Sequence, residues 1–183
     1  MCLGHQLVVG EKGLANSAFE GIIFTFSGQF NPVDSPLGYV DIQSGWFQHT
    51  ANPRSKYWGY DLLPIPSALE FSQARAVHIS NCTFHHMGAS ALAFGPGSQF
   101  CTVSHSSFLD ISGTAISLGG IYDESEIDLS LQSANLSISD CKISEAAVEW
   151  HSAAGIFIGF SRGTQVLHNR LRNLSYSAVS LSW

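Results

Sequence analysis

Acidic side chains occur at three places in the sequence where acid–base chemistry could be built. Asp110 lies in the segment FLDISG, Glu149 lies in EAAVEWHSA, and Asp123 lies in the acidic stretch GGIYDESEIDLS. Two carboxyl groups about 5 to 10 Å apart cover the separations used by retaining and inverting enzymes that hydrolyse glycosidic bonds. Asp110, Glu149 and Asp123 are therefore the candidate catalytic residues.

A second group of residues could contact a sugar, which offers hydroxyl groups at its edge and C–H groups on its faces. Polar side chains would bind the hydroxyl groups, and aromatic rings would stack on the faces. The candidate substrate-binding residues are Glu70, His86, Ser117, Tyr122, His151, Phe157 and Tyr176. A structural role stays open for each of these candidates. Asp110 can cap a turn, and the acidic stretch around Asp123 can be simply solvated. His86 and His151 can be turn residues.

Four segments of the chain align with one another and must position these residues. They are VHISNCTFHHMGASALAF (77–94), CTVSHSSFLDISGTAISL (101–118), LSISDCKISEAAVEWHSAAGIFI (136–158) and TQVLHNRLRNLSYSAVSL (164–181). Three columns of apolar residues recur in them: Ile79, Val103, Ile138 and Val166; Phe84, Phe108, Ile143 and Leu171; and Leu92, Ile116, Ile156 and Val179. A repeat of this length indicates a solenoid.

Each apolar run is short and alternates with period two, so the repeats are strands rather than helices. The sequence predicts an all-β fold, a right-handed single-stranded parallel β-helix of about five to six coils. We expect one domain over residues 1–183, with a loop excursion at 27–67 and regular coils at 68–183. Insertions near 119–133 and 144–153 account for the longer spacing between Ile116 and Ile156, because a solenoid tolerates insertions at its turns.

The slot after the turn between the second and third strands holds Cys82, Ser106, Cys141 and Asn169. In a β-helix this slot often carries a ladder of asparagines, and we expect a structural role for these smaller residues too. Cys82 and Cys141 belong to coils that are two apart in the repeat. Because adjacent coils are about 4.8 Å apart, these two cysteines are roughly 10 Å apart, which is too far for a disulfide. No cysteine spacing indicates zinc.

The excursion at 27–67 carries five prolines and several aromatic residues, among them Trp46 and Phe47. Long aromatic loops on a rigid scaffold often build binding sites. The alternative is that these rings pack the excursion onto the solenoid or cap its open end.

Charge and hydropathy limit the possible partners. The net charge is −6 with only 8 Lys and Arg residues, so we expect no nucleic-acid partner. No apolar run approaches the ~18 residues that span a bilayer, and no signal peptide opens the chain, so we expect no membrane partner. We expect a fragment that self-associates through its open coil ends, and that is secreted or extracellular in its full-length form.

Several stretches resemble a known family: GYVDIQSGWF (38–47), SALEFSQARAVHISNCTFHHMGASAL (67–92), FLDISGTAISLGG (108–120) and GIFIGFSRGTQVLHNRLRNLSYSAVSLSW (155–183). They resemble the β-helix repeat proteins of the pectate-lyase-like superfamily and, more narrowly, those grouped with glycoside hydrolase family 141. The resemblance implies hydrolysis of a polysaccharide or oligosaccharide by two acidic residues in a groove, with Asp110 carried over first and Glu149 or Asp123 as its partner. The chain has Ala178 where that family often has a glycine.

Two alternatives to a glycoside hydrolase stay open. One is a β-helix that binds glycans or supports assembly without catalysis. The other is a polysaccharide lyase, which on this fold uses Ca²⁺ held by carboxylates and an Arg or Lys as base; Arg162 follows the run GIFI, but cations are sparse near the other acidic positions. No cofactor is expected except Ca²⁺ under this last alternative.

Overall fold

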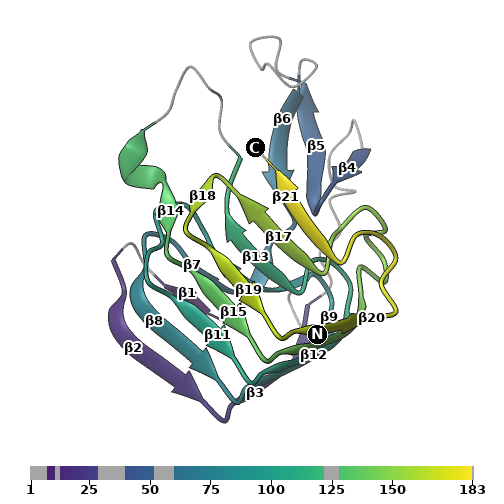
Figure 1. The fold of residues 1–183 in the computed structure, drawn as a ribbon. Coiled ribbons are helices and arrows are strands. Elements are labelled where there is room, and N and C mark those ends of the chain that lie inside the picture. The colour runs from purple at the N-terminus through teal and green to yellow at the C-terminus, as the bar shows by residue number, and fades with distance from the viewer. Residues whose placement is uncertain (1–7, 11–12, 29–39, 52–59, 122–127, 183) are drawn as a thin grey trace.

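The protein is a parallel β-helix whose coils stack along one axis. The computed structural model describes residues 8–10, 13–28, 40–51, 60–121 and 128–182 (Figure 1). Three parallel sheets form the sides of the solenoid, and each coil contributes one strand to each side. The predicted fold class is confirmed.

The three sheets are named A, B and C here. Sheet A has the order β1 (Val8–Gly10), β7 (Ser67–Phe71), β10 (Ser90–Phe94), β13 (Ile116–Gly119), β17 (Ile156–Gly159) and β21 (Val179–Ser182). Sheet B contains β2 (Ala15–Glu20), β8 (Arg75–Ser80), β11 (Thr102–Ser104), β15 (Ser137–Ser139) and β19 (Gln165–Leu167). Sheet C contains β3 (Ile23–Ser27), β9 (Thr83–Met87), β12 (Ser107–Ile111), β16 (Lys142–Ala146) and β20 (Arg170–Arg172).

The strand register reproduces the three apolar columns of the sequence. Ile79, Val103, Ile138 and Val166 are successive partners in sheet B. The Phe84 column runs through sheet C and the Leu92 column through sheet A in the same way. Because the period of a strand is two, this register turns these side chains to the inner side of the coils, where all are buried or partly buried except Val179 of the last strand, which is 42% exposed.

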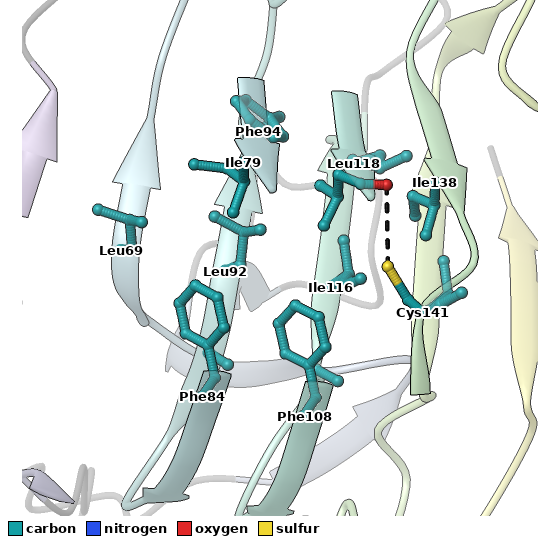
Figure 2. Close-up of a cluster of buried hydrophobic side chains, with 14 of the residues drawn as sticks. Leu69, Ile79, Phe84, Leu92, Phe94, Phe108, Ile116, Leu118, Ile138 and Cys141 are labelled. Atoms are coloured by element: carbon teal, nitrogen blue, oxygen red, sulfur yellow. Dashed lines mark hydrogen bonds between the residues drawn. The ribbon is translucent and has the colours of Figure 1, made fainter. Parts of the chain in front are cut away.

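Like side chains stack on like in the core. The rings of Phe84 and Phe108 lie 4.7 Å apart and nearly parallel (Figure 2). Phe24 stacks on the other face of Phe84, with ring centroids 4.6 Å apart. All three are buried. Truncating such a phenylalanine typically costs about 3–5 kcal/mol, so this column is a large contribution to the stability of the coils.

The slot after the turn between sheets B and C is a hydrogen-bonding ladder. The Cys82 backbone N–H donates to Ser106 Oγ at 3.1 Å, and the Cys141 N–H donates to Asn169 Oδ1 at 2.8 Å. Cys82, Cys101 and Cys141 are buried free thiols. The structural role expected for this slot agrees with these contacts.

The excursion differs from the expected loop. It contains an antiparallel sheet of β4 (Val40–Gln43), β5 (Trp46–Ala51) and β6 (Tyr60–Pro64), which stands beside sheet A (Figure 1). A separate cluster of buried apolar residues fixes it to the coils: Phe47, Ile65, Ala89, Ala147, Trp150 and Ala153. Trp46 and Phe47 are both buried, so these two rings pack the excursion onto the solenoid.

The remaining elements are small. A 3-10 helix at Leu129–Leu131 lies in the first insertion, and β14 (Ser133–Ala134) pairs with β18 (Ser161–Arg162). Within the described ranges, no helix is long and apolar enough to cross a membrane.

Candidate functional site

The outer face of sheet A presents one row of side chains across the coils. Glu70, Ala93, Ser117, Phe157 and Ser180 are successive register partners. Strand alternation turns Glu70, Ala93, Ser117 and Phe157 away from the core, because their neighbours on each strand are buried, and the register places Ser180 in the same row. This row contains three of the candidate substrate-binding residues, Glu70, Ser117 and Phe157.

A cavity of about 300 Å³ lies between this face and the antiparallel sheet. Glu70, Ala93 and Ser117 form its floor, and Trp46, Pro64 and Ile65 form one wall. The other lining residues are Ser67, Gly95, Pro96, Gly119, Gly120 and Ile121. Its volume is at the lower end of the ~300–1,000 Å³ typical of ligand pockets.

Two of the row's members are covered rather than exposed. The Phe157 ring is fully buried and meets the Trp46 ring in an edge-to-face contact, with centroids 6.0 Å apart. Ser180 is buried, and its Oγ lies 2.6 Å from Ser44 Oγ. Phe157 therefore supports the Trp46 wall from below and is not available to stack on a sugar, contrary to its expected role.

Polar contacts clamp the β4–β5 turn onto the coils. The backbone N–H and the hydroxyl of Ser152 both donate to the Asp41 carboxylate, and the Ser44 N–H donates to Ser152 O at 2.7 Å. Gly45 has φ +84°, and a Cβ there would lie 2.5 Å from Thr114 Oγ1. The turn approaches the coil so closely that only glycine fits, and this position fixes Trp46 beside it.

Asp110 lies elsewhere, at the corner that follows sheet C. Its Oδ2 is 2.6 Å from His86 Nδ1, and both side chains are almost half exposed. The Phe26 ring stacks on His86 with centroids 5.2 Å apart. None of these three residues lines the cavity, so the structure separates Asp110 and His86 from Glu70 and Ser117.

Asp110 and Glu149, one of the two acid pairs considered from the sequence, are not register partners. In the ladder between β12 and β16, Leu109 pairs with Ser144 and Ile111 pairs with Ala146. Glu145 is therefore the residue one coil from Asp110. Glu149 belongs to the insertion that follows β16, where its backbone N–H donates to Ser112 O at 3.2 Å.

The other predicted residues are scattered. His151 is exposed, with Nε2 3.1 Å from Val148 O, and Tyr176 is exposed in the last coil. Tyr122 and Asp123 lie outside the described residues, so their predicted roles stay predictions.

Sequence reasoning missed the cavity wall formed by Trp46, Pro64 and Ile65. It singled out the aromatic excursion but could not show which ring would face sheet A. The available signal was the pair Ser44–Gly45 directly before Trp46, a turn sequence that closes a hairpin.

Burial is the main electrostatic feature of the cysteines. It raises the pKa of the Cys141 thiol from its ordinary 9.0 to about 11, and the nearby Asp140 charge acts in the same direction. Burial also raises the pKa of Cys101. Neutral thiols are poor metal ligands and nucleophiles. In the described part of the chain, no group of three or more His, Cys, Asp or Glu side chains is arranged to hold a metal ion.

Comparisons with known proteins agree with this architecture. A solved structure named "Glycoside hydrolase" superposes with a TM-score of 0.77 at 22% sequence identity. The match covers 92% of this chain but only 31% of the other, so the chain spans less than a third of that protein's length. This likeness shows the fold. A search of curated proteins found no match.

The family model described as "Right handed beta helix region" matches residues 67–182, which is more than half of the chain. These are the residues that form the coils from β7 to β21. The chain belongs to the right-handed β-helix family.

Proposed function

We propose that this chain binds a carbohydrate in the cavity above sheet A and forms part of a glycoside hydrolase. The observation that carries the proposal is a carboxylate, Glu70, on the floor of a concave cavity that has the Trp46 indole in its wall. A carboxylate accepts hydrogen bonds from sugar hydroxyls, and the indole, of which only 9% is exposed, adds a small apolar surface beside it. The solved glycoside hydrolase of the same fold supports the proposal.

The cavity also has the right kind of floor for a hydroxyl-rich ligand. Ser117 lies two strands from Glu70 in the same row. Ala93 lies between them, and its small side chain leaves space above the sheet for a ligand. Coils are spaced by about 4.8 Å, so Glu70 and Ser117 are about 10 Å apart at their Cα atoms. At that separation, a single sugar ring placed between Glu70 and Ser117 contacts both side chains.

A second candidate function is glycan binding without cleavage. Glycosidic hydrolysis by the usual route uses two carboxyl groups, and Glu70 is the sole carboxylate among the described residues that line the cavity. A lyase is less well supported, because no Lys or Arg is among those lining residues.

Binding and hydrolysis are tested together on the whole chain with xylohexaose, cellohexaose and a fucosylated xyloglucan oligosaccharide. Calorimetry gives the affinity, and reducing-sugar release gives the activity. We expect at least one oligosaccharide to bind, and Glu70→Gln to weaken it at least tenfold. Glu20→Gln is the matched control, because Glu20 is an exposed carboxylate at the end of β2 in sheet B.

Equal loss of binding in both variants would contradict a site at Glu70. Binding without release of reducing sugar would leave the glycan-binding module as the function of this chain. Release that depends on Glu70 would establish the hydrolase.

A further inference from the structure

The outer face of sheet C gathers basic side chains at one end. Lys142 of β16 and Arg170 and Arg172 of β20 all point away from the core and are exposed. We call these three residues the basic patch. They are three of only eight Lys and Arg residues in a chain whose net charge is −6, so their concentration on two neighbouring strands is a local reversal of the molecule's overall charge.

The strand register fixes the spacing within the basic patch. Lys142 and Arg170 are direct partners in the parallel ladder, so their Cα atoms are about 4.8 Å apart. Arg170 and Arg172 alternate with partly buried Leu171 on one strand and lie on the same face, about 7 Å apart. Like charges placed directly opposite each other on a sheet destabilise it, and an anion bound between them would remove that repulsion.

The nearby acids do not neutralise the basic patch. Asp140 lies at the preceding corner, with Oδ1 3.7 Å from His168 Nδ1. Glu145 is an exposed residue near the end of β16, three positions after Lys142. In the part of the chain that the structure describes, no ion pair joins a carboxylate to any of the three cations.

The rest of this face can accommodate a chain of sugars. The outward positions of β9 and β12 carry Thr83 and His85, then Ser107 and Leu109, and none is acidic. Ser144 is the register partner of Arg172 and adds a hydroxyl next to the patch. The acidic residues within these strands are Asp110, near the end of β12, and Glu145, near the end of β16. The rest of the face is polar, and it lies on a different sheet from the cavity.

We propose that the basic patch binds the anionic groups, carboxylate or sulfate, of a polysaccharide that lies on the outer face of sheet C. The proposal deepens the proposed function, on which it rests for the choice of a carbohydrate. Arginine forms paired hydrogen bonds with planar or tetrahedral oxyanions, and lysine adds a point charge. The patch would hold an acidic polysaccharide on one face while the cavity contacts sugar rings on another.

The test uses dextran sulfate, carboxymethyl-dextran and neutral dextran of the same length, titrated onto the whole chain over a series of salt concentrations. We expect both charged polymers to bind and neutral dextran not to bind at this face. Arg172→Gln should weaken binding about fivefold, as expected for one exposed charge contact. The triple variant Lys142→Gln, Arg170→Gln, Arg172→Gln should weaken it about 100-fold and flatten its salt dependence.

Arg162→Gln is the matched control, because Arg162 is an exposed strand arginine on β18, outside sheet C. An equal loss with Arg162→Gln, or no loss in the triple variant, would overturn the proposal. So would a single-stranded oligonucleotide that binds the patch more tightly than either charged dextran. The preference between the two charged dextrans shows whether sulfate or carboxylate is the group recognised.

Failure of this proposal is distinguishable from failure of the proposed function. Glu70→Gln should leave dextran sulfate binding unchanged, and the triple variant should leave the binding of neutral oligosaccharides in the cavity unchanged. Loss of dextran sulfate binding in Glu70→Gln would contradict two separate sites.

Discussion

Asp110 and Glu145 occupy the same position in successive coils, and the backbone of each has a φ of 55°. His86 stands at this position one coil before Asp110, again with φ 55°. A left-handed residue at each passage through this corner turns the chain from sheet C toward sheet A. The corner therefore explains the backbone of Asp110 without a catalytic role, while placing two carboxylates about one coil apart, ~4.8 Å at Cα.

The first prediction separates the cavity from this corner. Glu70→Gln should reduce hydrolysis of an oligosaccharide at least tenfold, whereas Asp110→Asn should change it less than threefold. The reason is that Glu70 lines the cavity and Asp110 does not. Initial rates of reducing-sugar release at substrate concentrations well below saturation give the comparison.

Glu145→Gln and Glu149→Gln complete that series. If Asp110→Asn and Glu145→Gln each remove activity while Glu70→Gln does not, the corner after sheet C is the catalytic site. A large effect of Glu149→Gln with Asp110→Asn would instead support the pairing expected from the sequence.

The second prediction concerns pH and the buried thiol of Cys141. The pKa of this thiol is about 11 in the folded chain because burial disfavours the thiolate. Below pH 9 both the folded and the unfolded chain keep the proton. Between pH 9 and 11 only the unfolded chain loses it, so the free energy of unfolding falls with rising pH by up to about 2 kcal/mol.

Urea unfolding at pH 8, 9, 10 and 11 measures this fall in the original chain and in Cys141→Ser. Serine is the matched replacement because Ser106 fills the same slot one coil earlier. We expect the difference in stability between the two chains to shrink from pH 9 to 11. A difference that stays constant over this range would contradict the assignment of the high pKa to Cys141.

The coil architecture is predictable because its signal is repeated. One apolar column such as Leu92, Ile116 and Ile156 is weak evidence alone, but three columns with the same register leave one arrangement of the strands. The β1 and β2 strands escape sequence reasoning because Val8–Gly10 and Ala15–Glu20 lie before the aligned repeats and are separated from them by the excursion.

The site is less predictable because it depends on an insertion and an excursion. The row of Glu70, Ala93 and Ser117 follows from register alone, and the sequence predicts it. The sequence leaves Glu149 or Asp123 as the partner of Asp110 and does not single out Glu145, which the strand register places one coil from Asp110, because the insertion after β16 obscures the alignment there. The Trp46 wall depends on long-range packing against Phe157, which no local pattern encodes.

The third prediction tests the close approach of neighbouring coils at Gly119. This residue has φ +75°, and a Cβ there would overlap the Gly159 carbonyl oxygen of the next coil. Gly119→Ala should therefore lower the free energy of unfolding by about 3 kcal/mol or more, since neither backbone can move without breaking the ladder.

Gly21→Ala is its control, measured by the same urea titration. Gly21 has φ +68°, but a Cβ added there would meet nothing within 4 Å, and Asn81 and His105 fill the equivalent corner in later coils. Its loss should be about 1 kcal/mol, the strain of the backbone alone. Equal losses at the two glycines would show that contact with Gly159 has no effect.

The last prediction concerns Asp41, which holds the turn of the antiparallel sheet to the coils. Asp41→Ala removes both hydrogen bonds from Ser152, a loss of about 1–3 kcal/mol for partly buried groups. We expect this loss to fall on the β4–β5 hairpin rather than on the coils, because Phe84 and Phe108 do not contact it. Hydrogen exchange should therefore become faster in peptides covering 40–51 and stay unchanged at 101–118.

Oligosaccharide affinity should also fall in Asp41→Ala, because a looser hairpin no longer fixes the Trp46 wall. The control is Asp140→Ala, at a distant corner, which should change neither hydrogen exchange at 40–51 nor oligosaccharide affinity. Slower or unchanged exchange at 40–51 in Asp41→Ala would mean that apolar packing around Phe47 and Trp150 holds the hairpin without the clamp.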